Sequence, residues 1–193
     1  MRPDYFIGLD LGQVNDPTAL AVVERPMPWG ATAGDEPPYF LRHLQRFPLG
    51  TPYTRIVPAV ARLASRAPLL GRATLVIDQT GVGRPVLNMF QGAMVPARII
   101  PVTITGGNAV KTTEDGSNHV PKKELVFCLQ RLLHTGRLKV ARTLPEAETL
   151  LQELLSFRVK ITAAAHETFG AWRQGEHDDL LLAVALACWQ AER

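Results

Sequence analysis

The sequence predicts an α/β domain with a mixed sheet and helices on both faces. Three strand patterns precede the first helix, at residues 4–11, 18–24 and 39–47. Short apolar strands then alternate with helical patterns, at residues 53–67, 73–78, 84–90 and 98–103. Consecutive strands followed by strand–helix alternation are typical of a mixed sheet. The 193 residues are enough for one domain with a substantial core.

The elements of the first half follow from ordinary local signals. Asn15-Asp16-Pro17 is a turn that joins the first two strands in a hairpin. Apolar residues at helical spacing fill 53–67, and Pro68 ends that helix. Pro85 stands in the first turn of the helix expected over 84–90. The polar, glycine-rich stretch 105–119 is expected to form a loop.

The last third of the chain is expected to be mainly helical. An apolar face repeats after Pro121, and Gly136 caps this helix. A second amphipathic helix is expected over 144–155. It is followed by an expected hairpin of two segments, residues 157–161 and 168–172. The final helix, from about Asp179 to Gln190, is apolar on nearly every side, so we expect it to be buried.

The composition is that of an ordinary globular protein. Hydrophobic residues make up 46%, charged residues 20%, and the formal net charge is +3. This mild positive charge permits a nucleic-acid partner without requiring one. Cys128 and Cys188 lie in apolar helical patterns, which indicates small core residues in a reducing cytosol. No membrane-spanning stretch or signal peptide is found, so we expect a soluble intracellular protein without a membrane partner.

Aspartates stand at the ends of apolar segments in three separate parts of the chain. Asp10 closes the first strand and Asp78 closes the fourth, whereas Asp178 and Asp179 open the last helix. Side chains alternate along a strand, so Asp10 shares a face with Gly8. If the first and fourth strands are adjacent and parallel, both carboxylates emerge at the edge where open α/β sheets bind ligands.

Such carboxylates have a functional and a structural interpretation. Next to a core they are costly unless a cation pairs with them. Oxygen ligands alone favour Mg²⁺ or Mn²⁺ over zinc, and two ions about 3.5–4 Å apart would form the clamp used in phosphodiester hydrolysis. The alternative is that each is only a turn former or a helix N-cap. For Asp16 the turn interpretation is the stronger, and an auxiliary metal role is the alternative.

Three groups of motifs follow one another along the chain. They are Gly8-Leu9-Asp10-Leu11-Gly12 with Asp16-Pro17-Thr18-Ala19, Val76-Ile77-Asp78 with Gly81-Val82-Gly83, and Gly175-Glu176-His177-Asp178-Asp179. In this order they resemble the nuclease domain of the large terminase subunit of tailed bacteriophages, within the RNase H-like and RuvC-like superfamily. The resemblance covers nearly the whole chain.

The resemblance implies a fold, an activity and a set of site residues. The fold would be RNase H-like, with a five-stranded mixed sheet in the order 3-2-1-4-5 and an extra C-terminal hairpin. The activity would be metal-dependent endonucleolytic cutting of concatemeric double-stranded viral DNA during genome packaging, with two Mg²⁺ or Mn²⁺ ions. By match, the catalytic metal ligands would be Asp10, Asp78 and either Asp178 or Asp179. Asp179 is favoured because the resembling pattern places its ligand two residues after the histidine, and Asp16 matches an additional acidic position.

We expect residues 1–193 to form a single nuclease domain without an ATPase domain. No Walker A motif is present, since the segment Gly106 to Thr112 lacks the glycine before its lysine. The resemblance implies double-stranded DNA as a partner, together with an ATPase motor domain, the portal and the small terminase subunit. It also implies the cytoplasm of the bacterial host cell, and we expect the isolated domain to be monomeric.

Four basic residues are candidates for DNA contact. Lys122 and Lys123 stand at a helix start, where the helix dipole disfavours cations by roughly 0.3–1 kcal/mol unless a phosphate is near. Arg131 follows on the same helix, and Arg84 lies close to Asp78 in sequence. A solvated basic surface is the alternative for all four.

Three other functions stay open at this point. A RuvC-type nuclease shares the fold and the carboxylates, and it would prefer four-way junctions to linear duplex. An actin-like or sugar-kinase-like ATPase fragment would explain the segment Ile7 to Gly12, which resembles the first phosphate loop of that superfamily, although 193 residues are too few for its two domains. An inactive packing domain that contacts only portal or partner proteins would bind no metal at the aspartates.

Overall fold

The computed structural model describes residues 2–12, 16–27, 36–164 and 177–193. The strands of this part are β1 (Asp4–Asp10), β2 (Ala19–Arg25), β3 (Tyr39–Arg46), β4 (Ala73–Asp78), β5 (Ala97–Thr105), β6 (Lys111–Thr112), β7 (Asn118–Pro121) and β8 (Leu138–Val140). The helices are α1 (Tyr53–Ala64), α2 (Gly83–Gly92), α3 (Lys122–His134), α4 (Ala147–Ala164) and α5 (Asp179–Ala191). None of these helices is long and apolar enough to cross a membrane.

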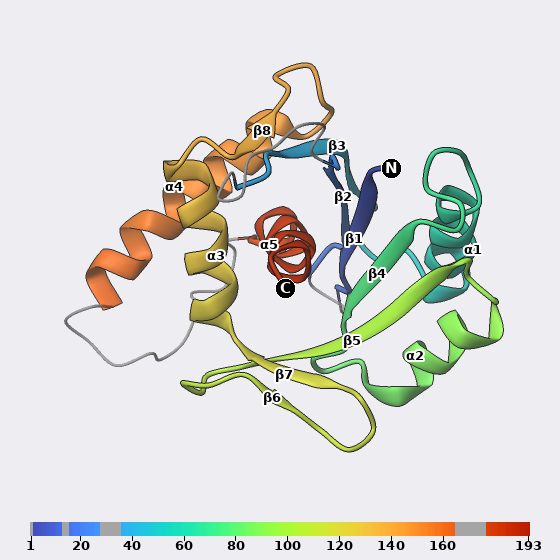
Figure 1. The fold of residues 1–193 in the computed structure, drawn as a ribbon. Helices are drawn as coiled ribbons and strands as arrows, with labels where there is room; N and C mark the ends of the chain where they lie inside the picture. The colour runs from blue at the N-terminus through green and yellow to red at the C-terminus, as the bar shows by residue number, and fades with distance from the viewer. Residues whose placement is uncertain (1, 13–15, 28–35, 165–176) are drawn as a thin grey trace.

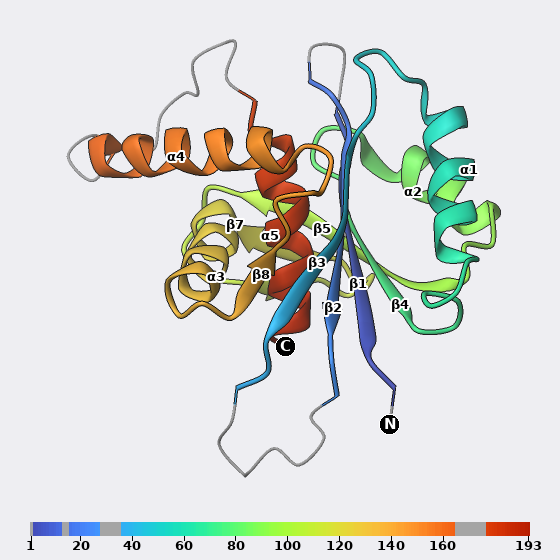
Figure 2. The same ribbon diagram turned by 90° about the horizontal axis from the view of Figure 1, so that it is seen from above.

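The strands form one mixed sheet in the order β6-β7-β5-β4-β1-β2-β3-β8 (Figures 1 and 2). The expected order 3-2-1-4-5 is intact at its centre, but the expected number of five strands is wrong. β7 and β6 extend the sheet beyond β5, and β8 extends it beyond β3. β6 and the first half of β7 fall in the stretch 105–119, which was expected to be a loop. These strands have too few residues to show a period of two.

The expected C-terminal hairpin is wrong in its first segment. α4 continues through residues 157–161. The sequence Phe157-Arg158-Val159-Lys160-Ile161 alternates like a strand, but no glycine or proline separates it from the preceding helix, so the helix extends through it. The second segment, residues 168–172, lies outside the described residues.

The sheet separates two apolar layers. Helices α1 and α2 cover one face, and α3, α4 and α5 cover the other (Figure 2). Ile7 and Ile77 belong to the core under α1 and α2, whereas Phe6 and Val76 belong to the core around α5. Because the faces alternate, Asp10 and Asp78 project toward α5, as Phe6 and Val76 do.

Helix α5 packs directly on β1, and Figure 1 shows it end-on between the sheet and α3. Nearly all of its residues are buried. A Cβ atom on Gly8 would lie 1.9 Å from the carbonyl oxygen of Ala183 and 2.9 Å from the amide nitrogen of Ala187. The absence of a side chain at Gly8 therefore allows this close approach.

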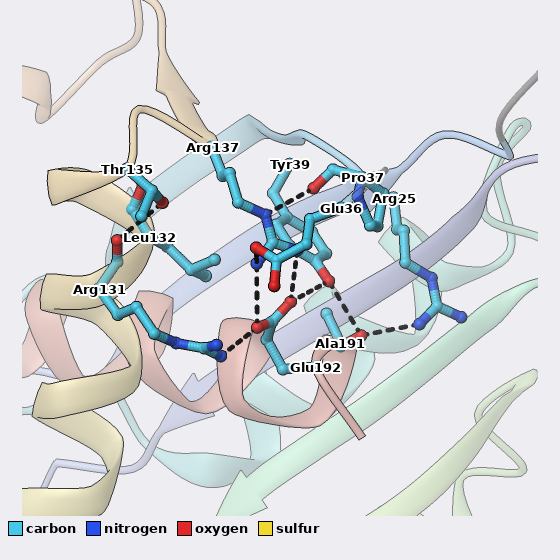
Figure 3. A network of polar contacts seen from close by, with 10 residues as sticks. All are labelled: Arg25, Glu36, Pro37, Tyr39, Arg131, Leu132, Thr135, Arg137, Ala191 and Glu192. Carbon is cyan, nitrogen blue, oxygen red and sulfur yellow. Dashed lines mark hydrogen bonds and ion pairs between the residues drawn. The ribbon is translucent and has the colours of Figure 1, made fainter. Parts of the chain in front are cut away.

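The carboxyl end of α5 is tied to the sheet by Glu192 (Figure 3). The Glu192 carboxylate accepts hydrogen bonds from the Tyr39 hydroxyl at 2.5 Å and from Arg137 Nη2 at 2.8 Å, and it also pairs with Arg131. Arg25 Nη1 donates to the neighbouring carbonyl of Ala191 at 2.7 Å. Burial opposes the ionised form, but the Tyr39 and Arg137 hydrogen bonds prevail and lower the pKa of Glu192.

We expect Glu192→Gln to lower the free energy of unfolding by about 2–3 kcal/mol at neutral pH. The substitution leaves the Arg137 side chain, only 10% exposed, without its main counter-charge. Because the folded-state pKa of Glu192 is lowered, its contribution is complete above the unfolded value of about 4.3 and is lost as the pH falls through the folded value. Urea unfolding of both proteins at neutral and acidic pH measures this difference.

Glu36→Gln is the matched control. Its carboxylate pairs with the same arginine at 2.7 Å but is 61% exposed, so we expect a loss below about 1 kcal/mol. Equal losses for the two variants would contradict the role given to Glu192.

Candidate metal centre

Asp10 and Asp78 stand side by side at the carboxyl ends of two parallel strands. They are direct partners in the β1–β4 register, which puts their backbones about 4.8 Å apart. Burial raises the pKa of both carboxyls, and the charge of Asp78 raises that of Asp10 further. Asp10 lies deep among protein atoms, yet part of it stays open to solvent. The structure thus brings these two carboxylates together at the ligand-binding edge of the sheet.

The amino end of α5 lies near the same two carboxylates. Asp178 is the N-cap of α5 and Asp179 is its first residue. After burial and Asp78, the charges of Asp178 and then of Asp179 raise the pKa of Asp10, whereas Lys122 lowers it. Both aspartates at the start of α5 therefore act on the Asp10 carboxyl.

Lys122 supplies positive charge at this point. Its Nζ lies 2.7 Å from Asp178 Oδ2, and both side chains are largely buried, at 25% and 21% exposure. The contact is an ion pair without the angles of a hydrogen bond. The amino end of α3, where Lys122 begins the helix, is thereby joined to the amino end of α5.

Asp179 faces a different cation. The Arg46 guanidinium, at the end of β3, donates hydrogen bonds to both Asp179 oxygens, at 2.7 and 3.0 Å. Burial raises the pKa of Asp179, and the contact with Arg46 opposes that rise. The two adjacent aspartates of α5 thus have separate partners.

The remaining acidic candidate, Asp16, lies on the rim of the site. Its exposed carboxylate is 3.9 Å from Nδ1 of His177, the residue before Asp178. This contact is an ion pair only when His177 is protonated. Asp78, by contrast, is held inside, because its Oδ1 accepts hydrogen bonds from the Thr80 amide at 2.8 Å and the Thr80 hydroxyl at 2.5 Å.

The donor set fits a hard divalent cation in its chemistry. As the side chains stand, no group of three His, Cys, Asp or Glu residues in the described part of the chain is arranged to hold a metal ion. The charges of Asp78 and Asp178 nevertheless oppose ionisation of Asp10, although a hydrogen bond with Asp10 lowers the pKa of Asp78. The Lys122 ammonium, paired with Asp178, acts on Asp10 in the opposite direction. A divalent ion with oxygen ligands would relieve this repulsion more fully than one ammonium group.

Two curated proteins with similar sequences are both terminase large subunits. No protein-family model matches the chain. The terminase large subunit of Thermus phage G20c is 29% identical over 193 residues, which are 99% of this chain and 33% of that protein. The terminase large subunit of Thermus virus P23-45 is 28% identical over the same shares. The chain spans about a third of the length of these curated relatives.

Solved structures decide the fold. The crystal structure of the large terminase nuclease from thermophilic phage G20c matches with a TM-score of 0.61 and 21% identity, over 96% of this chain and 81% of that one. The chain has the fold of a terminase nuclease domain. The predicted resemblance and the RNase H-like α/β fold class are confirmed, apart from the strand number and the first segment of the expected C-terminal hairpin.

Two more distant structures share this terminase nuclease fold. The Mn-soaked human cytomegalovirus terminase nuclease domain matches with a TM-score of 0.54 and 12% identity, over 95% of this chain and 82% of that one. The nuclease domain of the bacteriophage SPP1 large terminase with bound Mn matches with a TM-score of 0.53 and 8% identity, over 98% and 87%.

All four basic residues expected to meet DNA have partners within the chain. Lys123 bonds Asn108, Arg84 pairs with Asp115 at 2.7 Å, Arg131 pairs with Glu192, and Lys122 pairs with Asp178. Arg131 therefore belongs to the opposite end of α5 from the aspartates. Arg84 is 76% exposed, so its side chain is open to solvent.

An open groove of about 550 Å³ lies beyond the end of β4. It is lined by Gln79 and by residues of the β6–β7 hairpin, among them the acidic Glu114 and Asp115. Gln79 Nε2 donates to Thr103 Oγ1 at 3.1 Å and to Ser117 Oγ at 3.3 Å, so the hairpin is joined to the end of β4. Val102, the register partner of Asp78, faces α5, so the neighbouring Thr103 and the groove beside it lie on the other face of the sheet from the carboxylates.

Two residues of the site were missed by the sequence analysis. Arg46 is an ordinary last residue of a strand, and Glu153 lies on an amphipathic helix, where a glutamate is usually solvated. Glu153 is nevertheless buried, and burial raises its pKa to about 7. Glu153 is three residues after Leu150 and four before Phe157, so a charge on the apolar face of that helix was the available signal.

Proposed function

We propose that this chain is a divalent-metal endonuclease that cuts double-stranded DNA. The observation that carries the proposal is the pairing of Asp10 with Asp78 at the carboxyl ends of two parallel strands, in a chain with the terminase nuclease fold. The similar sequences of two terminase large subunits support it, as do two nuclease domains with this fold, one solved after soaking in Mn and one with bound Mn.

Asp10, Asp78 and Asp178 would hold Mg²⁺ or Mn²⁺, with Asp16 as an auxiliary ligand for a second ion. Asp179, the ligand favoured by resemblance, is the alternative to Asp178, but both of its oxygens are bonded to Arg46. When bound, such ions activate water and stabilise the leaving oxygen in phosphodiester hydrolysis. Lys122 lies beside Asp178, where its ammonium would meet a DNA phosphate once an ion neutralises the carboxylates.

The proposed DNA path passes the carboxyl ends of β1 and β4, where Asp10 and Asp78 lie. Lys123 and Arg84 would contact phosphates, because both lie at the surface with only local polar or acidic partners. Phosphate contacts carry no sequence information, so cutting should show little sequence preference and binding should weaken steeply with salt. In the proposed setting, genome packaging in the bacterial cytoplasm, an ATPase motor domain, the portal and the small terminase subunit would be the partners.

The protein is expected to nick and linearise supercoiled plasmid with Mn²⁺ or Mg²⁺ and to stop on addition of EDTA. Asp78→Asn should abolish cutting, because it removes a ligand while Thr80 still holds the side chain in place. Gel analysis of plasmid forms over time measures the rate. Asp4→Asn is the matched control, since Asp4 lies at the other end of β1 and pairs with Arg25 at 2.8 Å.

Equal cutting by the Asp78→Asn variant, or no cutting with either metal, would refute the proposal. A strong preference for four-way junctions over linear duplex would instead support a structure-specific nuclease of RuvC type.

A further inference from the structure

One row of the sheet carries both strand aspartates and an arginine. Asp78 pairs with Asp10, Asp10 with Ala19, and Ala19 with Arg46 in successive registers. Residues in one row share a face, so the Arg46 side chain also projects toward α5. Ala19 is fully buried and small, and it separates the cation from the two carboxylates. Arg46 therefore reaches the amino end of α5 from the far end of this row.

The Arg46 guanidinium holds Asp179 through two hydrogen bonds. Nε lies 2.7 Å from Oδ2 and Nη2 lies 3.0 Å from Oδ1. The Asp179 side chain is 5% exposed and that of Arg46 is 21% exposed. Such a fork requires the planar guanidinium, because a lysine ammonium cannot donate two parallel bonds in this geometry.

Glu153 completes the arrangement from α4. Its Oε1 pairs with the same Arg46 Nη2, and its Oε2 accepts the backbone N–H of Leu181 at 2.8 Å. Leu181 lies in the first turn of α5, where amide groups have no acceptor within the helix. Strand β3, helix α4 and the first turn of α5 are thereby joined around one guanidinium.

We propose that Arg46 and Glu153 are positioning residues that fix the first turn of α5 through Asp179 and so set Asp178 beside Asp10. This inference rests on the proposed metal centre. Asp178 is the N-cap that directly precedes Asp179, so fixing Asp179 on Arg46 also fixes where the backbone of Asp178 enters the helix. Arg46 acts through Asp179 and needs no contact with metal or DNA.

Arg46→Lys tests the inference, because it keeps the charge and loses the fork. In the metal-free variant, hydrogen exchange at the Leu181 and Leu182 amides should be faster than in the original protein. Mn²⁺ affinity, measured by calorimetry without DNA, should fall by about 10–100-fold. Cleavage should recover at saturating Mn²⁺. The Mn²⁺ concentration needed for half-maximal cleavage should therefore change more than the maximal rate. Arg42→Lys is the matched control, because Arg42 lies on the same strand and its exposed side chain pairs with Glu24. It should change neither hydrogen exchange, nor Mn²⁺ affinity, nor cleavage.

Asp179→Asn should behave like Arg46→Lys, with cleavage restored by high Mn²⁺, whereas Asp178→Asn should not be restored. If Arg46→Lys fails to fold by circular dichroism, Glu153→Gln provides the same readouts. Unchanged exchange and Mn²⁺ affinity in these variants would overturn the inference and leave the proposed function intact. Failure of high Mn²⁺ to restore Asp179→Asn would also overturn it. Absence of Mn²⁺ binding and cutting in the original protein would be a failure of the proposed function itself.

Discussion

Asp10→Asn is expected to reduce DNA cleavage by roughly 1,000-fold or more and to stabilise the metal-free protein at the same time. Asp10 lies deep in the protein, and the charges of Asp78, Asp178 and Asp179 act against its ionised form. An amide of the same shape removes that repulsion, which we expect to add about 1–3 kcal/mol to the free energy of unfolding.

Thermal unfolding in EDTA and in Mn²⁺ separates the two effects. In EDTA the Asp10→Asn variant should unfold at a higher temperature than the original protein. Mn²⁺ should raise the midpoint of the original protein and leave that of the variant unchanged. An ion stabilises a folded protein only if that folded protein binds it. Asp4→Asn, at the opposite end of β1, should show neither effect. A lower midpoint for Asp10→Asn in EDTA would refute the destabilising effect ascribed to the charges around Asp10.

Gly8→Ala is expected to destabilise the fold by at least about 3–5 kcal/mol, or to prevent folding. The added Cβ would lie 1.9 Å from the backbone oxygen of Ala183, and backbone in a buried helix cannot move aside as the end of a side chain can. The midpoint of urea unfolding, followed by circular dichroism, measures the loss.

Gly92→Ala is the matched control for this substitution. Gly92 ends α2, and a Cβ there would meet no atom within 4 Å. Alanine should therefore stabilise the helix by about 0.5–1 kcal/mol. If the Gly8→Ala variant unfolds at the same urea concentration as the original protein, α5 does not lie against β1 as described.

The central sheet was predictable because its determinants are local. Alternation in β1 and β4 put Asp10 and Asp78 on one face, and their placement needed only that the two strands be neighbours. The outer strands β6 and β8 were not predictable, since two or three residues are too few to show a period. They become strands only because the edge strand beside each of them offers free backbone hydrogen-bonding groups. The strand expected over 157–161 failed because alternation in a short segment does not outweigh an uninterrupted helix.

The surroundings of the aspartates depended on contacts between distant parts of the chain. Arg46 is 133 residues before Asp179 and 107 before Glu153, so no local pattern connects them. The same holds for Lys122, which the sequence suggested as a DNA contact and which the structure places against Asp178. The residue types indicated a charged site, but only the folded structure shows which acidic and basic side chains form ion pairs.

Helix α5 is held at both ends by arginines, through Asp179 at its start and through Glu192 after its end. A helix that slips by one residue moves 1.5 Å along its axis and turns by about 100°, which would bring a different aspartate round to Asp10. Because both ends are fixed, the helix can neither screw forward nor rotate in place. Glu192, about 20 Å away along the helix, thus helps to determine which carboxylate faces the sheet. A change at Glu192 can therefore alter the rotation of the amino end of α5 about the helix axis.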